Sequence, residues 1–171
     1  MPMLDAYIPQ GALSPESERA LLGELTDLLL RHEGADPADA RTRSIAWVFV
    51  HRPEVYVAGA PAGAPRYRFV CQVPEGQYND ERRAAVTAEM TEALARAEGG
   101  RWPNPQERVW VFTSEIPDGT CGAQGHIFRL PDIAGYVAGD AGRQYAERQL
   151  AARRRETAEA LLAARNQEVP A

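Results

Sequence analysis

The second residue of the chain, Pro2, combines a residue type and a position that can do chemistry. A start methionine that precedes a small residue is normally removed, which would leave Pro2 as the amino terminus. An amino-terminal proline is a secondary amine that can accept a proton, return it, or attack a carbonyl carbon. A free α-amino group titrates near pH ~7.7–8.0, and burial or a nearby cation lowers its pKa further. Pro2 therefore predicts a general base that works near neutral pH without a histidine.

Regular elements that could position Pro2 follow it at once. Residues 3–8 are predicted to form a strand, and Pro9-Gln10-Gly11 ends it. Ser14-Pro15-Glu16 is typical of a helix start, and leucines at helical spacing extend the predicted helix to about residue 32. After a polar loop at 35–43, residues 44–51 predict a second strand. Because that strand is apolar at nearly every position, we expect it to be buried on both faces or to lie between other elements.

The same order of elements then repeats. A strand is predicted at 66–73 and a helix at about 79–97, and a strand at 108–113 and a glycine-marked hairpin complete the copy. The segment Trp110-Val111-Phe112 also repeats the pattern of Trp47-Val48-Phe49. True duplication is favoured over the ordinary alternation of an α/β protein, and strands joined through a helix should be parallel. The sequence thus predicts an α+β fold of two β-α-β units, with a four-stranded sheet and two helices on one face. The other face would be bare and apolar in a single chain, so we expect a closed oligomer to cover it.

Composition predicts the domain boundaries of the chain and the kinds of partner that it lacks. Residues 2–138 form the predicted domain, in halves of about 2–65 and 66–138, and residues 139–171 form a helical tail of good helix formers. The net charge of −5 argues against nucleic-acid binding. No apolar run approaches the ~20 residues needed to span a bilayer, and the start of the chain lacks the basic and apolar regions of a signal peptide, so no membrane role is expected and a cytoplasmic location is predicted. Cys71 and Cys121 lack metal-ligand spacing, so we expect neither metal nor cofactor.

A proline directly after the start methionine of a duplicated β-α-β chain resembles the tautomerase superfamily. Its long-chain members, the cis-3-chloroacrylic acid dehalogenases and malonate semialdehyde decarboxylases, are the most similar. The resemblance covers about residues 2–130 and rests on three features, namely Pro2, the segment His51-Arg52-Pro53 that leads into 55–59, and Trp110-Val111-Phe112 before 115–117. It implies a tautomerase/MIF-like fold, a homotrimer, and a pocket at Pro2 for small carboxylate or keto-acid substrates.

The chain departs from the catalytic pattern of those enzymes. The arginine pair that they carry at the start of the second helical segment has no counterpart in residues 74–78. The tyrosine that the dehalogenase carries on its last long strand corresponds to Phe112, its water-activating glutamate falls near Ala123, and its helix-one histidine falls near Leu29. The decarboxylase aspartate falls in the loop that holds Asp39. We therefore expect Pro2 chemistry without the dehalogenation machinery.

The substrate carboxylate must then be held by other residues. Arg52 and Arg68 are the predicted binding residues, and a surface salt bridge is the alternative for each. His51 and Tyr78 are further candidates for the same pocket. Two functions stay open: an isomerase-type enzyme that uses Pro2 on a small keto/enol or unsaturated carboxylate, and a catalytically inactive trimeric binding or scaffold protein of the same fold.

Overall fold

The computed structural model describes residues 3–167, so Pro2 lies outside the described residues. The chain divides into two compact units, residues 1–73 with 77–115 and residues 74–76 with 116–171. In the part of the chain that the structure describes, no helix is long and apolar enough to cross a membrane.

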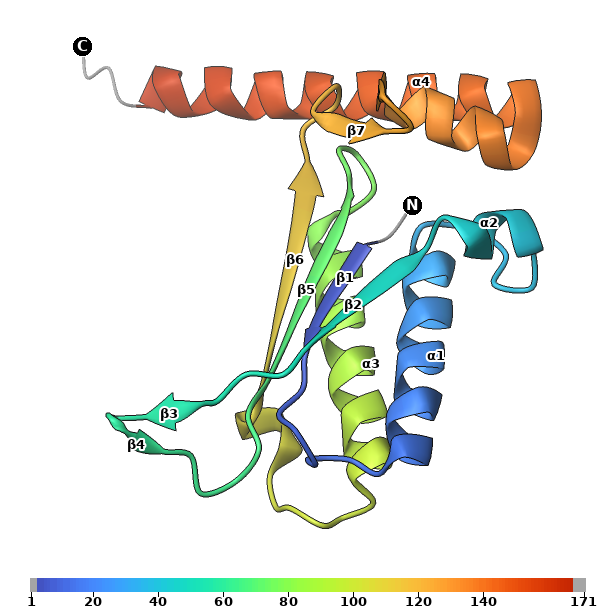
Figure 1. The fold of residues 1–171 in the computed structure, drawn as a ribbon. Helices are drawn as coiled ribbons and strands as arrows, with labels where there is room; N and C mark the ends of the chain where they lie inside the picture. The colour runs from blue at the N-terminus through green and yellow to red at the C-terminus, as the bar shows by residue number, and fades with distance from the viewer. Residues whose placement is uncertain (1–2, 168–171) are drawn as a thin grey trace. The chain divides into compact units, whose positions relative to one another are not determined.

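The first unit is built on a four-stranded sheet in the order β2-β1-β5-β6, with helices α1 and α3 on one face (Figure 1). The long strands and helices have the following bounds: β1 Met3–Tyr7, α1 Pro15–His32, α2 Ala40–Ser44, β2 Trp47–His51, β5 Tyr67–Pro74, α3 Asp80–Glu98 and β6 Val109–Ile116. A short hairpin of β3 (Tyr56–Val57) and β4 (Ala60–Pro61) follows β2, and a 3-10 turn at Pro105–Glu107 precedes β6. This element order confirms the predicted fold class.

Strand directions agree with the duplicated β-α-β pattern. Strands β1 and β2 pair in parallel, with Met3 opposite Trp47 and Tyr7 opposite His51. Strands β1 and β5 pair antiparallel and place Arg68 opposite Tyr7. At the two ends of β5 and β6, Tyr67 N donates to Arg108 O and Glu75 N donates to Ile116 O, so this pair is parallel as well.

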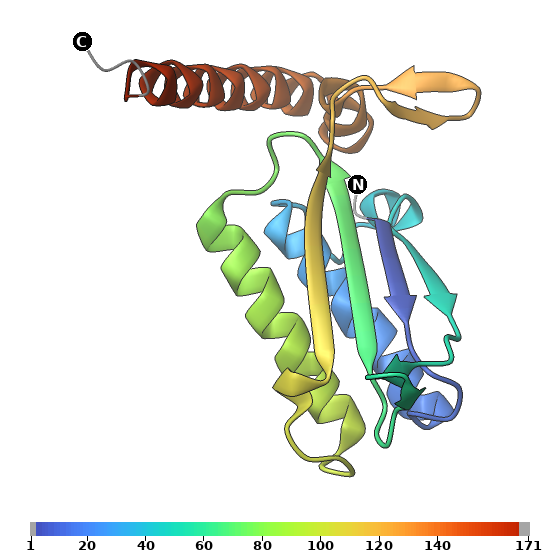
Figure 2. The same cartoon turned by 90° about the vertical axis from the view of Figure 1, so that its left-hand side faces the viewer.

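Both helices begin where the sequence predicts. Ser14 caps α1 by accepting a hydrogen bond from Ser17 N at 3.1 Å, and Asn79 caps α3 by accepting one from Arg82 N at 2.8 Å. Figure 2 shows the two helices lying side by side behind the sheet. Their apolar sides and one face of β1 and β5 form the core, whose buried members include Leu4, Ala6, Phe69, Cys71, Leu21, Leu25, Leu28, Val86, Met90 and Leu94.

The face of the sheet that carries no helices is exposed in a single chain, as predicted. Within one chain β2 and β6 are the edge strands, and only one face of the sheet is covered by helices. Trp47 and Phe49 are therefore 56% and 47% exposed, and Trp110 and Phe112 are 70% and 40% exposed. Strand β2 starts at Trp47, three residues later than predicted, because a short helix α2 runs to Ser44. Asp39 caps this helix by accepting a hydrogen bond from Thr42 N.

The second unit contains a hairpin and a long helix. Strands β7 (Cys121–Ala123) and β8 (His126–Phe128) pair antiparallel, which agrees with the predicted hairpin. Helix α4 (Leu130–Gln167) begins before the predicted tail and is interrupted at Ala138 and Gly139, where Gly139 has a φ of 65°. Glycine is the residue that takes this backbone conformation without a steric penalty.

Candidate functional site

Tyr78 lies at the end of the sheet at which β1 begins. Strand β5 pairs Gln72 with Met3, and the chain then continues past Pro74 to Tyr78 and into α3. Figures 1 and 2 show the end of α1 and the start of α3 at this same end of the sheet. Met3, which follows Pro2 in the sequence, therefore lies at the same end of the sheet as the end of α1 and the start of α3.

Five side chains at this end form what we call the Tyr78 cluster: Glu33, Tyr78, Arg82, Arg83 and Glu115. Tyr78 N donates to Glu115 Oε1 at 2.8 Å, and Arg83 Nη2 lies 3.5 Å from Glu115 Oε2. The Arg83 guanidinium also sits over the Tyr78 ring, 5.6 Å from its centre. Arg82 Nη1 donates to the carbonyl oxygen of Gln77 at 2.5 Å. The cluster thus combines two cations, two carboxyl groups and a phenol.

The Tyr78 hydroxyl has no hydrogen-bond partner among the described residues, although the side chain is only 2% exposed. A buried polar group without a partner costs about 1–3 kcal/mol, so it calls for an explanation such as a ligand. Burial, with Cys71 and Glu33 nearby, raises the pKa of Tyr78, so at neutral pH the hydroxyl keeps its proton and can donate it. Burial likewise raises the pKa of Glu33.

Arg82 and Arg83 were missed by sequence reasoning, as was Glu33. Residues 74–78 contain no arginine, whereas Asn79 caps α3 and the first turn that follows it contains both arginines. Cations at the positive end of a helix oppose the helix dipole, so helix stability does not account for their placement. The signal in the sequence is the helix cap at Asn79, because two arginines follow it in a helix turn where cations are unfavourable.

The other predicted residues lie toward the opposite end of β1. His51 Nε2 is 2.6 Å from Asp5 Oδ1, and its ring stacks on Tyr7 with ring centres 4.3 Å apart. The Arg68 guanidinium lies over Tyr7, 5.2 Å from the ring centre, and over Phe112 at 4.9 Å. Because Tyr7 is four residues from Met3 along a strand, this group is separated from the Met3 end by roughly 13 Å.

Arg52 is engaged in an ion pair. Its Nη1 and Nη2 each donate to one carboxylate oxygen of Glu18, at 2.6 Å in both cases. The hydrogen bond from Arg52 and its charge lower the pKa of Glu18. This bidentate pair ties the end of β2 to α1, so of the predicted site residues Arg52 has a clear structural role.

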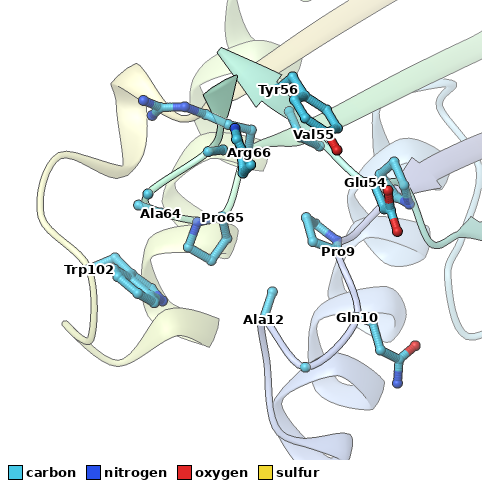
Figure 3. Close-up of a pocket in the computed structure, with 15 residues that line it drawn as sticks. Pro9, Gln10, Ala12, Glu54, Val55, Tyr56, Ala64, Pro65, Arg66 and Trp102 are labelled. Atoms are coloured by element: carbon cyan, nitrogen blue, oxygen red, sulfur yellow. The ribbon is translucent and has the colours of Figure 1, made fainter. Parts of the chain in front are cut away.

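Two cavities flank the β3–β4 hairpin. One of about 580 Å³ has Pro9 and Ala12 on one wall and Pro65 and Arg66 on another (Figure 3). The other, of about 910 Å³, is bordered by Tyr7, Tyr56, Arg66, Arg68, Trp110 and Phe112. No group of three or more potential metal ligands occurs among residues 3–167, and burial raises the pKa of the Cys71 thiol to about 12, far from a reactive thiolate.

Comparison with solved structures identifies the fold. The chain is similar to Pt0534, solved after inactivation by 2-oxo-3-pentynoate (23% identity, 73% of this chain and 94% of that one, TM-score 0.59). It is also similar to N1, a member of the cis-3-chloroacrylic acid dehalogenase family (19% identity, 74% of this chain and 82% of that one, TM-score 0.59). A third similar structure is Q0, a fused 4-OT solved as a symmetric trimer (24% identity, 73% of this chain and 94% of that one, TM-score 0.59). No family model and no curated protein matches the chain.

These similarities, which extend over about three quarters of the chain, show that it has a tautomerase/MIF-like fold. The solved structures that the chain resembles include fused 4-OT proteins.

Proposed function

We propose that the chain is a tautomerase-type enzyme in which Pro2, freed by removal of Met1, acts as general base and acid on a small keto/enol or unsaturated carboxylate. The observation that carries this proposal is the Tyr78 cluster at the end of the sheet where β1 begins. It offers a buried phenol with an unpartnered hydroxyl and two arginines in the first turn of α3. A substrate with a carboxylate and an enol oxygen would match these donors.

The proposed reaction moves one proton. The neutral Pro2 nitrogen takes the proton of the enol hydroxyl, and the resulting enolate is stabilised by a guanidinium and by the Tyr78 hydroxyl, which donates a hydrogen bond. The protonated Pro2 then delivers a proton to carbon, which yields the keto product and restores the free amine. Positive charge from Arg82 and Arg83 would lower the pKa of Pro2 and keep it neutral at working pH.

The predicted substrate roles of Arg52, Arg68 and His51 remain a separate proposal. Because His51 and Arg68 pair with Tyr7 rather than with Met3, they would reach a Pro2 site only across a subunit boundary. We also propose a homotrimer, supported by the exposed aromatic residues of β2 and β6 and by the trimeric state of the fused 4-OT.

Two measurements test the enzyme. The first compares enol-to-keto conversion of phenylenolpyruvate by the wild type and by Pro2→Ala, and we expect a loss of about 100-fold or more in the variant. The second treats the protein with 2-oxo-3-pentynoate and looks by mass spectrometry for an adduct on Pro2. The amine nitrogen would bond to the alkyne carbon β to the ketone, and a proton from water would complete the addition.

Equal activity in the two proteins would overturn the enzyme and favour the alternative, an inactive trimeric binding or scaffold protein of the same fold. The same conclusion would follow from an intact mass that retains Met1, because Pro2 nitrogen would then be an amide.

A further inference from the structure

We infer that helix α4 positions Tyr78 for the proposed reaction, because Gln149 and Arg154 hold residues 74–76, the segment that leads directly to Tyr78. This role rests on the proposed function, in which the Tyr78 hydroxyl stabilises the enolate. Gln149 and Arg154 are positioning residues, since they act on the chain and not on the substrate. The resemblance in sequence to the tautomerases ends near residue 130, so most of α4 lies outside it.

The first attachment is at Gly76. Residues 74–76 belong to the same compact unit as α4, and Gln149 Nε2 donates to the carbonyl oxygen of Gly76 at 2.7 Å. Gly76 has a φ of 91°, a conformation that favours glycine, so the backbone here is specialised to present that carbonyl. Leu150 is 6% exposed, and its Cα would lie 3.8 Å from a Cβ placed at Gly76. The helix therefore packs directly on this segment.

The second attachment is at Glu75. Arg154 Nε donates to Glu75 Oε1 at 3.1 Å, and Arg154 Nη2 donates to Asp118 Oδ2 at 3.3 Å. The other oxygen of Glu75, Oε2, accepts from Asp118 N at 2.9 Å. The hydrogen bond from Arg154 lowers the pKa of Glu75, so this carboxylate stays charged well below neutral pH. Helix α4 thus holds two consecutive residues of the segment.

The segment is joined to the Tyr78 cluster by a very short length of chain. Only Gln77 separates Gly76 from Tyr78, and the carbonyl oxygen of Gln77 accepts from Arg82 Nη1 at 2.5 Å. A displacement of Gly76 would therefore move the Tyr78 phenol, and a misplacement of about 1 Å can cost up to about 100-fold in rate. The two arginines belong to α3, which has its own cap at Asn79 and should move less.

The test replaces the donor in Gln149→Glu. The two side chains have nearly the same shape, but a carboxylate cannot donate to the Gly76 carbonyl oxygen. A glutamate four residues before Arg153 is a favourable pair on a helix, so α4 itself should be retained. The matched control is Gln144→Glu, the same change at an exposed position of the same helix. Circular dichroism should show equal helix content in both variants.

Hydrogen exchange measured by mass spectrometry reports the attachment without any substrate. Peptides that cover residues 75–79 should exchange about threefold faster or more in Gln149→Glu than in the wild type, since local opening becomes easier. Gln144→Glu should exchange like the wild type. Peptides from residues 86–97 of α3 should be unchanged in both variants, which excludes a general loss of stability.

Kinetics with phenylenolpyruvate report the positioning of Tyr78. We expect kcat to fall about fivefold or more in Gln149→Glu while KM changes less than about twofold, because the hydroxyl acts on the enolate and the arginines hold the carboxylate. Gln149→Lys keeps a terminal N–H donor and should restore most of the kcat and of the protection. If the wild type itself does not convert phenylenolpyruvate, the proposed function fails, and hydrogen exchange still decides whether α4 holds the segment.

A second pair of variants tests the attachment at Glu75. Arg154→Gln should also raise exchange in residues 75–79, though less, because the Arg154 side chain is 53% exposed. Its control is Arg155→Gln, at the next and also exposed position of α4.

Three results would overturn the positioning role of α4. The first is exchange in residues 75–79 that is the same in Gln149→Glu and Gln144→Glu. The second is faster exchange in Gln149→Glu with the kcat of an active wild type retained. The third is an equal loss of kcat in Gln149→Glu and Gln149→Lys, because the hydrogen bond to Gly76 would then not be its cause.

Discussion

Tyr78 is fixed by its backbone and its ring, while its hydroxyl has no partner among the described residues. Removing that hydroxyl in Tyr78→Phe should leave the free energy of unfolding unchanged or raise it by about 1 kcal/mol, because a buried unsatisfied group disappears. If the hydroxyl donates to the enolate, the same change should lower kcat about 10- to 100-fold. Urea unfolding and the phenylenolpyruvate assay measure the two effects. A variant that is less stable yet fully active would contradict the proposed role.

The pair of Arg52 with Glu18 predicts a pH dependence of stability. Arg52 lowers the pKa of Glu18 in the folded chain, so the pair stabilises the fold above the unfolded pKa of about 4.3 and loses this effect as the pH falls through the folded pKa. Because both side chains are partly exposed, Arg52→Gln should cost only about 0.5–1 kcal/mol at pH 7. Urea unfolding of both proteins at pH 7 and pH 3 checks this. A cost that is the same at both pH values would show that the ion pair is not its source.

At the scale of elements, a buried ion pair joins the end of α3 to the start of β6. Arg108 and Glu98 form two hydrogen bonds to each other, and Tyr67 donates to Glu98 Oε1 at 2.8 Å from the first position of β5. The Arg108 and Glu98 side chains are 4% and 1% exposed. Tyr67, Glu98 and Arg108 therefore link three elements within the core of the first unit.

Glu98→Ala should destabilise the chain by about 3–5 kcal/mol, because Arg108 would be left buried with an uncompensated charge. The control is Glu92→Ala on the same helix, which removes an exposed partner of Arg96 and should cost less than about 0.5 kcal/mol. Urea denaturation followed by circular dichroism measures both. Similar costs for the two variants would mean that the buried pair contributes no more than a surface pair.

At the scale of the whole molecule, the helix-free face of the sheet is the feature that a single chain leaves open. Trp47 and Phe49 are opposite Met3 and Asp5 in the register of β1 and β2, on the side away from the core residues Leu4 and Ala6. Soluble monomers rarely expose a contiguous apolar patch of this kind. Closed oligomers are the usual means of covering one.

We expect the wild type to sediment as a trimer at micromolar concentration and Phe49→Lys to sediment as a single chain, because burying a lysine at this position would cost several kcal/mol. Thr87→Lys, at an exposed position of α3, is the matched control and should remain trimeric. Analytical ultracentrifugation decides the matter, and a wild type that sediments at the mass of one chain would refute the trimer.

Local sequence patterns predicted the elements and their order. The caps at Ser14 and Asn79, the spacing of leucines in α1, and the paired strand–helix–strand pattern were all predicted and are confirmed. These features depend on interactions within a few residues of the chain, such as a side chain that bonds to a backbone N–H of the next turn. The two β-α-β units could therefore be predicted from the elements and their repetition, and the tautomerase fold from the resemblance that Pro2 and the quoted segments carry.

The tertiary structure alone decided which of those elements meet. The apolar composition of residues 44–51 did not show where the strand lies in the sheet; the strand order places β2 at an edge, with Trp47 exposed in a single chain. His51 and Arg68 were grouped with Pro2 by type, whereas the register pairs both with Tyr7. Strand order and register are set by contacts between segments 40 or more residues apart, and a local pattern of residue types carries little information about such contacts.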